Sequence, residues 1–275
     1  MNKIWFLPFL RQGCYIVIIC IGCVIANISY SQSEQLAELY YQNQVAERNV
    51  TLETNFYQKF GANYPCLYGT FPVGLDSQHS ISDGHKFACG LHSIRGNPIV
   101  YSFGSNRQQD FETSILTYRP DSLIYVFEIN HDHLPNTADR NPQIQYFNLG
   151  LGPKIPKLFK KKMMLLSEIM DMLHHHYVDI VKIDIEGSEY YLPRESSRPF
   201  AHVGQLLIEI HNFMPYWAGY RPVREADIRT LVDYFESQEL RIFHKELHYL
   251  LNGCCSEFSF IQQNFTHFDA FKQFR

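Results

Sequence analysis

The sequence predicts an α/β protein with a mainly parallel sheet, helices on both faces and an antiparallel pair of strands at one edge. Three observations support this fold class. Apolar strand patterns alternate with amphipathic helix patterns through the middle of the chain, and two strand patterns follow each other near its end. In addition, 45% of the 275 residues are hydrophobic, which is enough for a substantial core.

The first thirty residues form a segment that differs from the rest of the chain. Lys3 and Arg11 precede an apolar run, and no charged residue occurs between Arg11 and Glu34. Such a segment enters a bilayer with its basic end in the cytoplasm, which places the remainder in the secretory lumen. We divide the chain into a signal anchor or a removable signal peptide, a polar stem and a folded domain: residues 1–30, 31–63 and 64–275. The prediction is a single-pass type II membrane protein, with a secreted form as the alternative.

Glycosylation sites and cysteines agree with a lumenal domain. Sequons begin at Asn49 and Asn264, where glycans are attached in secreted proteins. The folded part holds an even number of cysteines, which allows two disulfides in three connectivities. These are Cys66, Cys89, Cys254 and Cys255. A bridge between Cys66 and Cys89 would restrain the irregular lead-in over residues 64–94. Four reduced thiols in a cytosolic enzyme are the alternative.

The first strand and helix follow this lead-in. An apolar run that ends in glycine predicts a strand over residues 98–104. Phe111, Ile115 and Tyr118 then recur at i, i+4 and i+7, which predicts a helix with Asp110 as its cap.

The remaining elements continue the alternation. Apolar runs rich in Ile, Val, Leu and aromatic residues predict further strands over residues 122–129, 144–152, 178–185 and 205–211. Helical spacing of apolar residues predicts one helix from about Ser167 and a last one around residues 228–235. The runs RIFHKEL and EFSFIQ predict the terminal antiparallel pair.

Candidate site residues lie at strand ends, because ligands of such sheets bind outside the carboxyl ends of the strands. In chain order they are Gly104 to Asn106, Glu128, Asp184, Glu186, Glu209 and His211. Glu189 is expected on the next helix, apart from this site.

Several of these stretches resemble a known family. VYSFG, DIVKIDIEGSEYYL and LLIEIH, in this order and spacing, are similar to S-adenosylmethionine-dependent methyltransferases of the FkbM type. SDGHKFACG and CCSEFSFI bring the chain closer to the membrane-anchored branch typified by methyltransferase-like protein 24. The resemblance covers residues 64–262. It implies a Rossmann-like, seven-stranded methyltransferase sheet and S-adenosylmethionine as cofactor.

The resemblance also implies roles for the residues at the strand ends. Gly104 and Ser105 would approach the methionine part of the cofactor, where close backbone approach requires glycine. Glu128 would accept hydrogen bonds from both ribose hydroxyls. Asp184 and Glu186 would face the cofactor's charged end or the substrate.

The chain departs from the family pattern in three places, one of them in the lead-in, where His85 replaces the second glycine of the motif. Ser105, Asn106 and Arg107 stand where members carry a second glycine, and Glu128 stands where aspartate is usual, so its longer side chain has to fold back. The glycine missing near Ser105 leaves open a non-catalytic lumenal domain that has lost the cofactor.

His211 is the candidate general base, with Glu209 on the same strand face, because transfer to a hydroxyl requires loss of its proton. The sequence favours an enzyme, and the predicted function is O-methylation of a glycan or small hydroxylated acceptor in the secretory lumen. This function requires no metal. The alternative is a metal-dependent glycosyltransferase with Asp184 and Glu186 on a hard divalent ion. A net charge of -4 argues against nucleic acid as a partner, and the oligomeric state is not predicted.

Overall fold

The computed structural model describes residues 60–74, 85–154, 163–215, 221–247, 254–263 and 265. All of them belong to the second of two compact units of the chain, which spans residues 52–275. The predicted anchor, most of the stem, and Asn49 and Asn264 lie outside the described residues. Within these ranges, none of the helices has the length and hydropathy that a membrane span requires.

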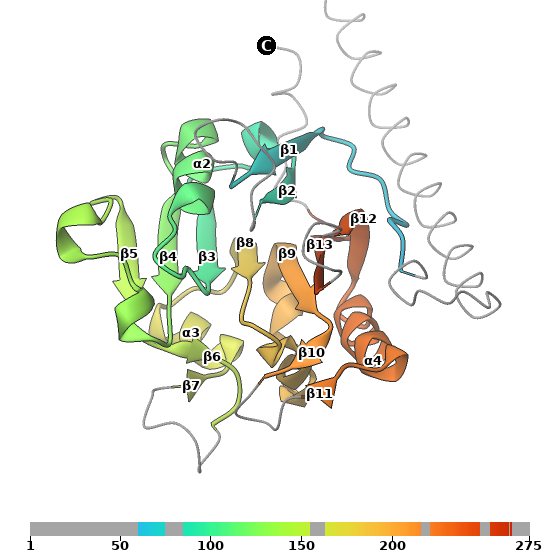
Figure 1. The fold of residues 1–275 in the computed structure, drawn as a ribbon. Helices are drawn as coiled ribbons and strands as arrows, with labels where there is room; N and C mark the ends of the chain where they lie inside the picture. Colours follow the sequence, from blue (N-terminus) through green and yellow to red (C-terminus); the bar gives the residue numbers. More distant parts are fainter. Residues whose placement is uncertain are drawn as a thin grey trace, which may run out of the picture. The chain divides into compact units, whose positions relative to one another are not determined.

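A seven-stranded sheet forms the centre of this unit, with the order β12-β13-β9-β8-β3-β4-β5 (Figure 1). Strands β3, β4, β5, β8 and β9 run parallel, whereas β13 pairs antiparallel with β9 and β12. The strands are β3 (Ile99–Phe103), β4 (Leu123–Phe127), β5 (Ile144–Phe147), β8 (Val178–Ile183), β9 (Val203–His211), β12 (Leu240–Leu247) and β13 (Cys255–Gln262). The predicted Rossmann-like fold class is confirmed, including its antiparallel edge pair.

The strand order reverses between β3 and β8. From β3 the chain builds outward to β4 and β5, and it then returns to place β8 and β9 on the other side. The loops that leave two such neighbouring strands diverge, which opens a crevice at their carboxyl ends. Gly104 follows β3 and Asp184 follows β8, so both lie at this crevice.

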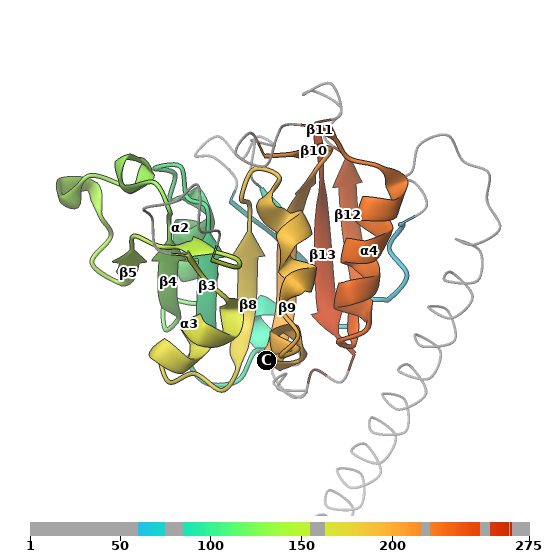
Figure 2. The ribbon, with the colours of Figure 1, turned by 90° about the horizontal axis from the view of Figure 1, so that it is seen from below.

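Helices cover the sheet on both sides, as Figures 1 and 2 show. On one face lie α3 (Leu166–Met172), the 3-10 helix η4 (Ser188–Arg194) and α4 (Glu225–Glu236). On the other lie α2 (Asp110–Tyr118) and the two-stranded sheet β1 (Thr70–Val73) and β2 (Lys86–Cys89). Shorter elements are η1 (Leu91–Ser93), η2 (His131–His133), η3 (Thr137–Asp139), β6 (Gly150–Leu151), β7 (Met163–Met164), η5 (Pro199–His202), β10 (Phe213–Met214) and β11 (Arg221–Pro222).

The two faces of the sheet differ in chemistry. The α3–α4 face carries the main apolar cluster, which includes Phe103, Val181, Ile208 and Phe258 packed against buried residues of α4 such as Phe235. Alternate residues of the same strands point to the opposite face. That face carries buried polar side chains at Lys182, Gln205, Glu209 and Glu257. The acidic end of β8 is therefore part of a polar face rather than an isolated solvated strand end.

Three details correct the sequence analysis. The single strand expected over residues 144–152 is divided into β5 and β6, because the chain leaves the central sheet after Phe147. In β6, Gly150 packs closely against Met163, and a Cβ added to Gly150 would lie 2.6 Å from the sulfur atom of Met163. The lead-in is not wholly irregular, since it holds β1 and β2. The N-cap of α2 is Gln109, and Asp110 is its first helical residue.

The expected bridge between Cys66 and Cys89 is present, with the two Cα atoms 5.7 Å apart. Gln205 of β9 ties this region down further. Its side-chain amide donates to the carbonyl of Cys89 (2.7 Å) and its oxygen accepts from the Cys89 N–H (2.6 Å). These contacts hold β2 against the polar face of the sheet.

Candidate active site

A cavity of about 710 Å³ lies at the carboxyl ends of β3, β4, β8 and β9. Its volume is in the range of pockets that bind small molecules and cofactors. All the residues predicted from strand ends as cofactor-binding or catalytic line it: Gly104, Ser105, Glu128, Asp184, Glu186, Glu209 and His211. Tyr216, Trp217 and Tyr220, which follow β10 in the sequence, lie outside the described residues.

The loop after β3 turns sharply at Gly104. This residue has φ 78°, and a Cβ built on it would overlap the carbonyl oxygen of Asp184. The loop continues through Asn106 (φ 42°) and Arg107 (φ 68°), two non-glycine residues in the left-handed region. The backbone thus makes the turn for which family members use a second glycine, at a conformational cost of about 1–2 kcal/mol per residue, least for asparagine.

Glu128 stabilises this loop, because its side chain folds back as the sequence analysis requires. Oε2 accepts the backbone N–H groups of Ser105 (3.1 Å) and Asn106 (3.3 Å), and Oε1 accepts that of Asn130 (2.8 Å). Charge-assisted bonds of this kind contribute more than neutral ones. Oε2 already accepts two hydrogen bonds, whereas Oε1 accepts one and can accept one more. Glu128 can therefore bind one ribose hydroxyl rather than the two expected from the sequence.

Lys182 and Asp184 connect the ends of β3 and β8. The Lys182 ammonium donates to the carbonyl oxygens of Gly104 and Phe103 and lies 3.8 Å from the Asp184 carboxylate. Burial alone would raise the pKa of Asp184, but Lys182, Lys86 and His211 together lower it. Asp184 therefore presents a carboxylate to the cavity at neutral pH.

His211 lies among several carboxylates. Its Nδ1 is 3.1 Å from Oε1 of Glu189, and its Nε2 is 3.5 Å from Glu186 and 3.9 Å from Glu209. Burial alone would lower its pKa, but Glu189, Glu209 and Asp184 raise it to about 10. The ring therefore carries a proton at neutral pH, and in that state it cannot act as the general base that we predicted.

Glu189 lies outside the cavity lining, on the following helix as expected, but it supports a residue of the site. Its side chain is fully buried and contacts His211. The same Oε1 atom accepts the N–H groups of Ile185 (3.2 Å) and Gly187 (3.4 Å). Glu189 therefore fixes both the loop after β8 and the orientation of the imidazole.

Glu209 and Lys86 extend the cluster inward. Burial, with Asp184 and Glu257 nearby, raises the pKa of Glu209 to about 9, so the acid is neutral at pH 7 and donates a hydrogen bond to Asp184. The fully buried Lys86 of β2 pairs with Glu257 and lies 3.8 Å from Glu209. Nothing in the sequence near Lys86 indicated this role, because β2 reaches the site only through tertiary packing.

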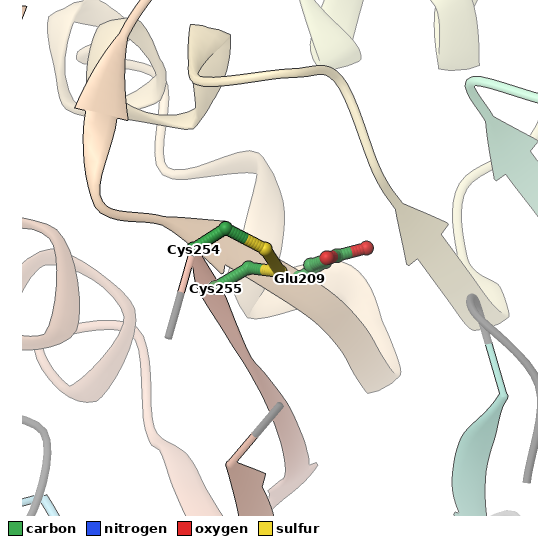
Figure 3. Close-up of side chains that lie close together, drawn as sticks. All are labelled: Glu209, Cys254 and Cys255. Atoms are coloured by element: carbon green, nitrogen blue, oxygen red, sulfur yellow. A yellow bond between two sulfur atoms is a disulfide. The ribbon is translucent and has the colours of Figure 1, made fainter. Parts of the chain in front are cut away.

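Cys254 and Cys255 complete the cavity wall beside Glu209 (Figure 3). The two adjacent cysteines form a disulfide, and Cys255 lies opposite His211 in the β9–β13 ladder. Their sulfur atoms and a carboxylate oxygen of Glu209 lie within 4.8 Å of one another. The adjacent pair in the sequence was the only signal for this wall, and it did not indicate nearness to the site.

The raised pKa values predict that alkaline pH destabilises the protein. The pKa of His211 rises from 6.5 to about 10 on folding, and that of Glu209 from 4.5 to about 9. The folded state therefore keeps protons that the unfolded chain has released, so the free energy of unfolding falls as pH rises through this window. Each proton contributes up to roughly 1.4 kcal/mol per pH unit. Urea denaturation at about pH 7 and about pH 9 measures the loss. His211→Gln should reduce the slope, and an equal slope in wild type and variant would contradict the assignment.

Comparison with known proteins assigns the chain to a family. A sequence profile described as a methyltransferase domain matches residues 29–262. The chain belongs to this family. Membership confirms the methyltransferase domain that the sequence motifs predicted. No match was found among curated proteins.

Solved structures similar to this methyltransferase domain include several methyltransferases. The fibrillarin pre-rRNA processing protein of Methanococcus jannaschii is 8% identical, with 61% of this chain and 67% of that chain covered and a TM-score of 0.43. TrmK of M. capricolum, in complex with S-adenosylhomocysteine, is 10% identical (62% and 65% covered, TM-score 0.40). Magnesium protoporphyrin IX methyltransferase of Synechocystis, with bound S-adenosylmethionine, is 13% identical (60% and 70% covered, TM-score 0.37).

Proposed function

We propose that this methyltransferase domain binds S-adenosylmethionine in the cavity and transfers its methyl group to an oxygen of a hydroxylated acceptor. The observation that carries the proposal is the loop after β3. It keeps the close turn at Gly104 and is fixed by two hydrogen bonds to Glu128, although the second glycine is missing. This geometry favours retained cofactor binding over the non-catalytic alternative.

The residues present fit the cofactor. Gly104 has no side chain, so the cofactor can approach the backbone at the crevice. Glu128 can still accept a hydrogen bond from a ribose hydroxyl. Asp184 supplies a negative charge near the positions expected for the cationic groups of S-adenosylmethionine. When bound, S-adenosylmethionine supplies a methyl group on a sulfonium, whose C–S bond breaks with the electron pair left on sulfur as the C–O bond forms. The chain's own residues then have to align the acceptor and handle one proton.

His211 accepts the acceptor's proton only after it has lost its own. Its ring lies at the cavity wall with Phe213 packed edge-to-face against it, at 5.0 Å between ring centroids. At neutral pH the ring is already protonated, so deprotonation of the acceptor becomes easier as pH rises towards about 10. The proposal therefore includes a rate of methyl transfer that increases with pH.

We place the acceptor among glycans and small hydroxylated molecules, and the protein in the secretory lumen as a membrane-anchored or secreted form. The supports are the basic-then-apolar N-terminal segment, the sequons and the pairing of Cys66 with Cys89. The motifs KIDIEG and LLIEIH further support the FkbM type and the branch of methyltransferase-like protein 24.

Calorimetry with the full chain and S-adenosylmethionine tests the cofactor assignment. Glu128→Gln keeps the shape of the side chain but turns one acceptor oxygen into a donor, so a loop amide loses its partner. We expect at least about tenfold weaker binding, since a hydrogen bond to a charged group is worth roughly 1.5–3 kcal/mol.

Glu239→Gln is the matched control for this experiment. Glu239 is exposed and lies outside the cavity, so the same chemical change there should leave affinity unaltered. If the folded wild-type chain bound no S-adenosylmethionine, the non-catalytic alternative would replace the proposal.

A further inference from the structure

We infer that Asp184, Glu186 and His211 form a site for one divalent cation that accepts both oxygen and nitrogen ligands, such as Mn²⁺ or Zn²⁺. One ligand atom from each residue lies within 4.8 Å of the others, at the edge of the cavity. The inference rests on the proposed function, because it assigns the cation a role in preparing the acceptor. From the sequence we predicted no metal for a methyltransferase. We paired Asp184 with Glu186 only in the glycosyltransferase alternative, and the fold adds His211 from the neighbouring strand.

The spacing around Nε2 of His211 is the first support. This nitrogen belongs to a side chain only 5% exposed and faces Oε2 of Glu186 at 3.5 Å. That separation exceeds the usual 2.7–3.2 Å of an N–H···O hydrogen bond. Two ligands that each lie about 2.1 Å from one ion are separated by roughly 3–3.5 Å at tetrahedral or octahedral angles. The pair therefore has the separation expected of two ligands of a shared cation.

The other ring nitrogen supplies the second support. Nδ1 contacts Glu189, which is fully buried and is itself held by the backbone N–H groups of Ile185 and Gly187. A carboxylate that accepts the far N–H of an imidazole fixes its tautomer and leaves the near nitrogen free to bind a metal. The arrangement of Glu189 and His211 is the one that metal-binding histidines ordinarily have.

The turn after β8 brings Glu186 to this position. Glu186 has φ 54° and Gly187 has φ 85°, so the chain reverses directly after the strand. Gly187 packs against β10, where an added Cβ would lie 2.5 Å from the carbonyl oxygen of Phe213. The Glu186 side chain is 78% exposed, which gives an ion access from solvent and leaves coordination positions for water or an acceptor oxygen.

A cation at this site would take over from His211 the handling of the acceptor's proton, and His211 would then serve as a ligand rather than as the base. Binding of the ion takes the place of the proton on His211, since a metal ligand must be the neutral imidazole. The acceptor hydroxyl bound to the ion has a lowered pKa and releases its proton to water. The resulting oxygen forms the C–O bond while the methyl group's bond to sulfur breaks and sulfur keeps the electron pair.

Titration of the full chain with Mn²⁺ in the absence of S-adenosylmethionine tests the site, with the electron paramagnetic resonance signal of free Mn²⁺ as the readout. Cys254 and Cys255 are paired in a disulfide, and Mn²⁺ prefers carboxylate ligands over sulfur, so these two residues do not compete for it. We expect one ion per chain. Glu186→Gln, at an exposed position that does not endanger folding, should weaken binding at least about tenfold, as loss of a charged ligand does.

Glu239→Gln is the control, because Glu239 is also exposed and also has a left-handed backbone (φ 68°) but lies away from the cavity. Absence of Mn²⁺ binding, or equal binding by wild type and Glu186→Gln, would overturn the cation site. S-adenosylmethionine binding measured without metal is a separate result. A chain that binds the cofactor but no Mn²⁺ refutes this inference alone, and a chain that binds Mn²⁺ but no cofactor refutes the proposed function alone.

Discussion

Gly104→Ala should abolish cofactor binding and strongly destabilise the domain. Alanine at φ 78° costs about 1–2 kcal/mol, and its Cβ would in addition overlap the carbonyl oxygen of Asp184, which forces β3 and β8 apart. We expect a loss of roughly 2–5 kcal/mol in the free energy of unfolding. Affinity for S-adenosylmethionine should fall by about 100-fold or more, because a displacement near 1 Å is enough to disrupt a site of this kind.

Gly96→Ala separates backbone strain from the clash. Gly96 has a similar φ of 64°, but no heavy atom lies within 4 Å of the position that a Cβ would take there, so only the strain remains. Urea denaturation should show a loss of about 1–2 kcal/mol for Gly96→Ala and at least twice that for Gly104→Ala. Calorimetry on whichever chains remain folded should show unchanged cofactor affinity for Gly96→Ala. Equal stability losses in the two variants would mean that Gly104 does not hold the strands at their close approach.

The order of strands and helices was predictable because each buried strand leaves a local signal. β8 and β9 are buried along their whole length and read as short apolar runs, while α4 shows its apolar residues at helical spacing. The candidate residues followed from the rule that ligands bind at strand ends, and Gly104 and Asp184 do lie at the point where the strand order reverses. Local pattern and sheet topology were enough for this part of the site.

The electrostatic part of the site was not predictable, because it depends on packing between distant segments. Lys86 lies 171 residues before Glu257, and no local pattern pairs them. From the sequence, Glu189 is an ordinary residue of the helix after β8. In the structure, the turn at Gly187 places its side chain against His211. The protonation of His211 depends on three acidic residues at different positions of the chain, so the sequence suggested a general base where the fold favours an imidazolium.

Lys86→Met should be the most destabilising change at a charged residue of the site. The ammonium of Lys86 is fully buried and contacts both Glu257 and Glu209. Burial alone would lower its pKa, but Glu257, Asp184 and Glu209 raise it, so the group is charged and offsets the charge of Glu257. Removal of one partner leaves a buried carboxylate without its counter-ion, which costs roughly 3–5 kcal/mol. We therefore expect a loss of that size in the free energy of unfolding.

Two further chains show whether this loss comes from the buried ion pair. Lys154→Met makes the same substitution in an exposed pair, where the lysine is 73% exposed and lies 3.2 Å from Glu168, so it should change stability by about 1 kcal/mol or less. Lys86→Met combined with Glu257→Gln removes both buried charges and should recover a large part of the loss, because the penalty comes from the stranded charge rather than from the missing attraction. Urea denaturation of these chains together with wild type and Glu257→Gln alone closes the double-mutant cycle and gives the coupling directly. If the double variant were no more stable than Lys86→Met, Lys86 would not offset the charge of Glu257. The packing of the long Lys86 side chain would then be the reason for its burial in β2.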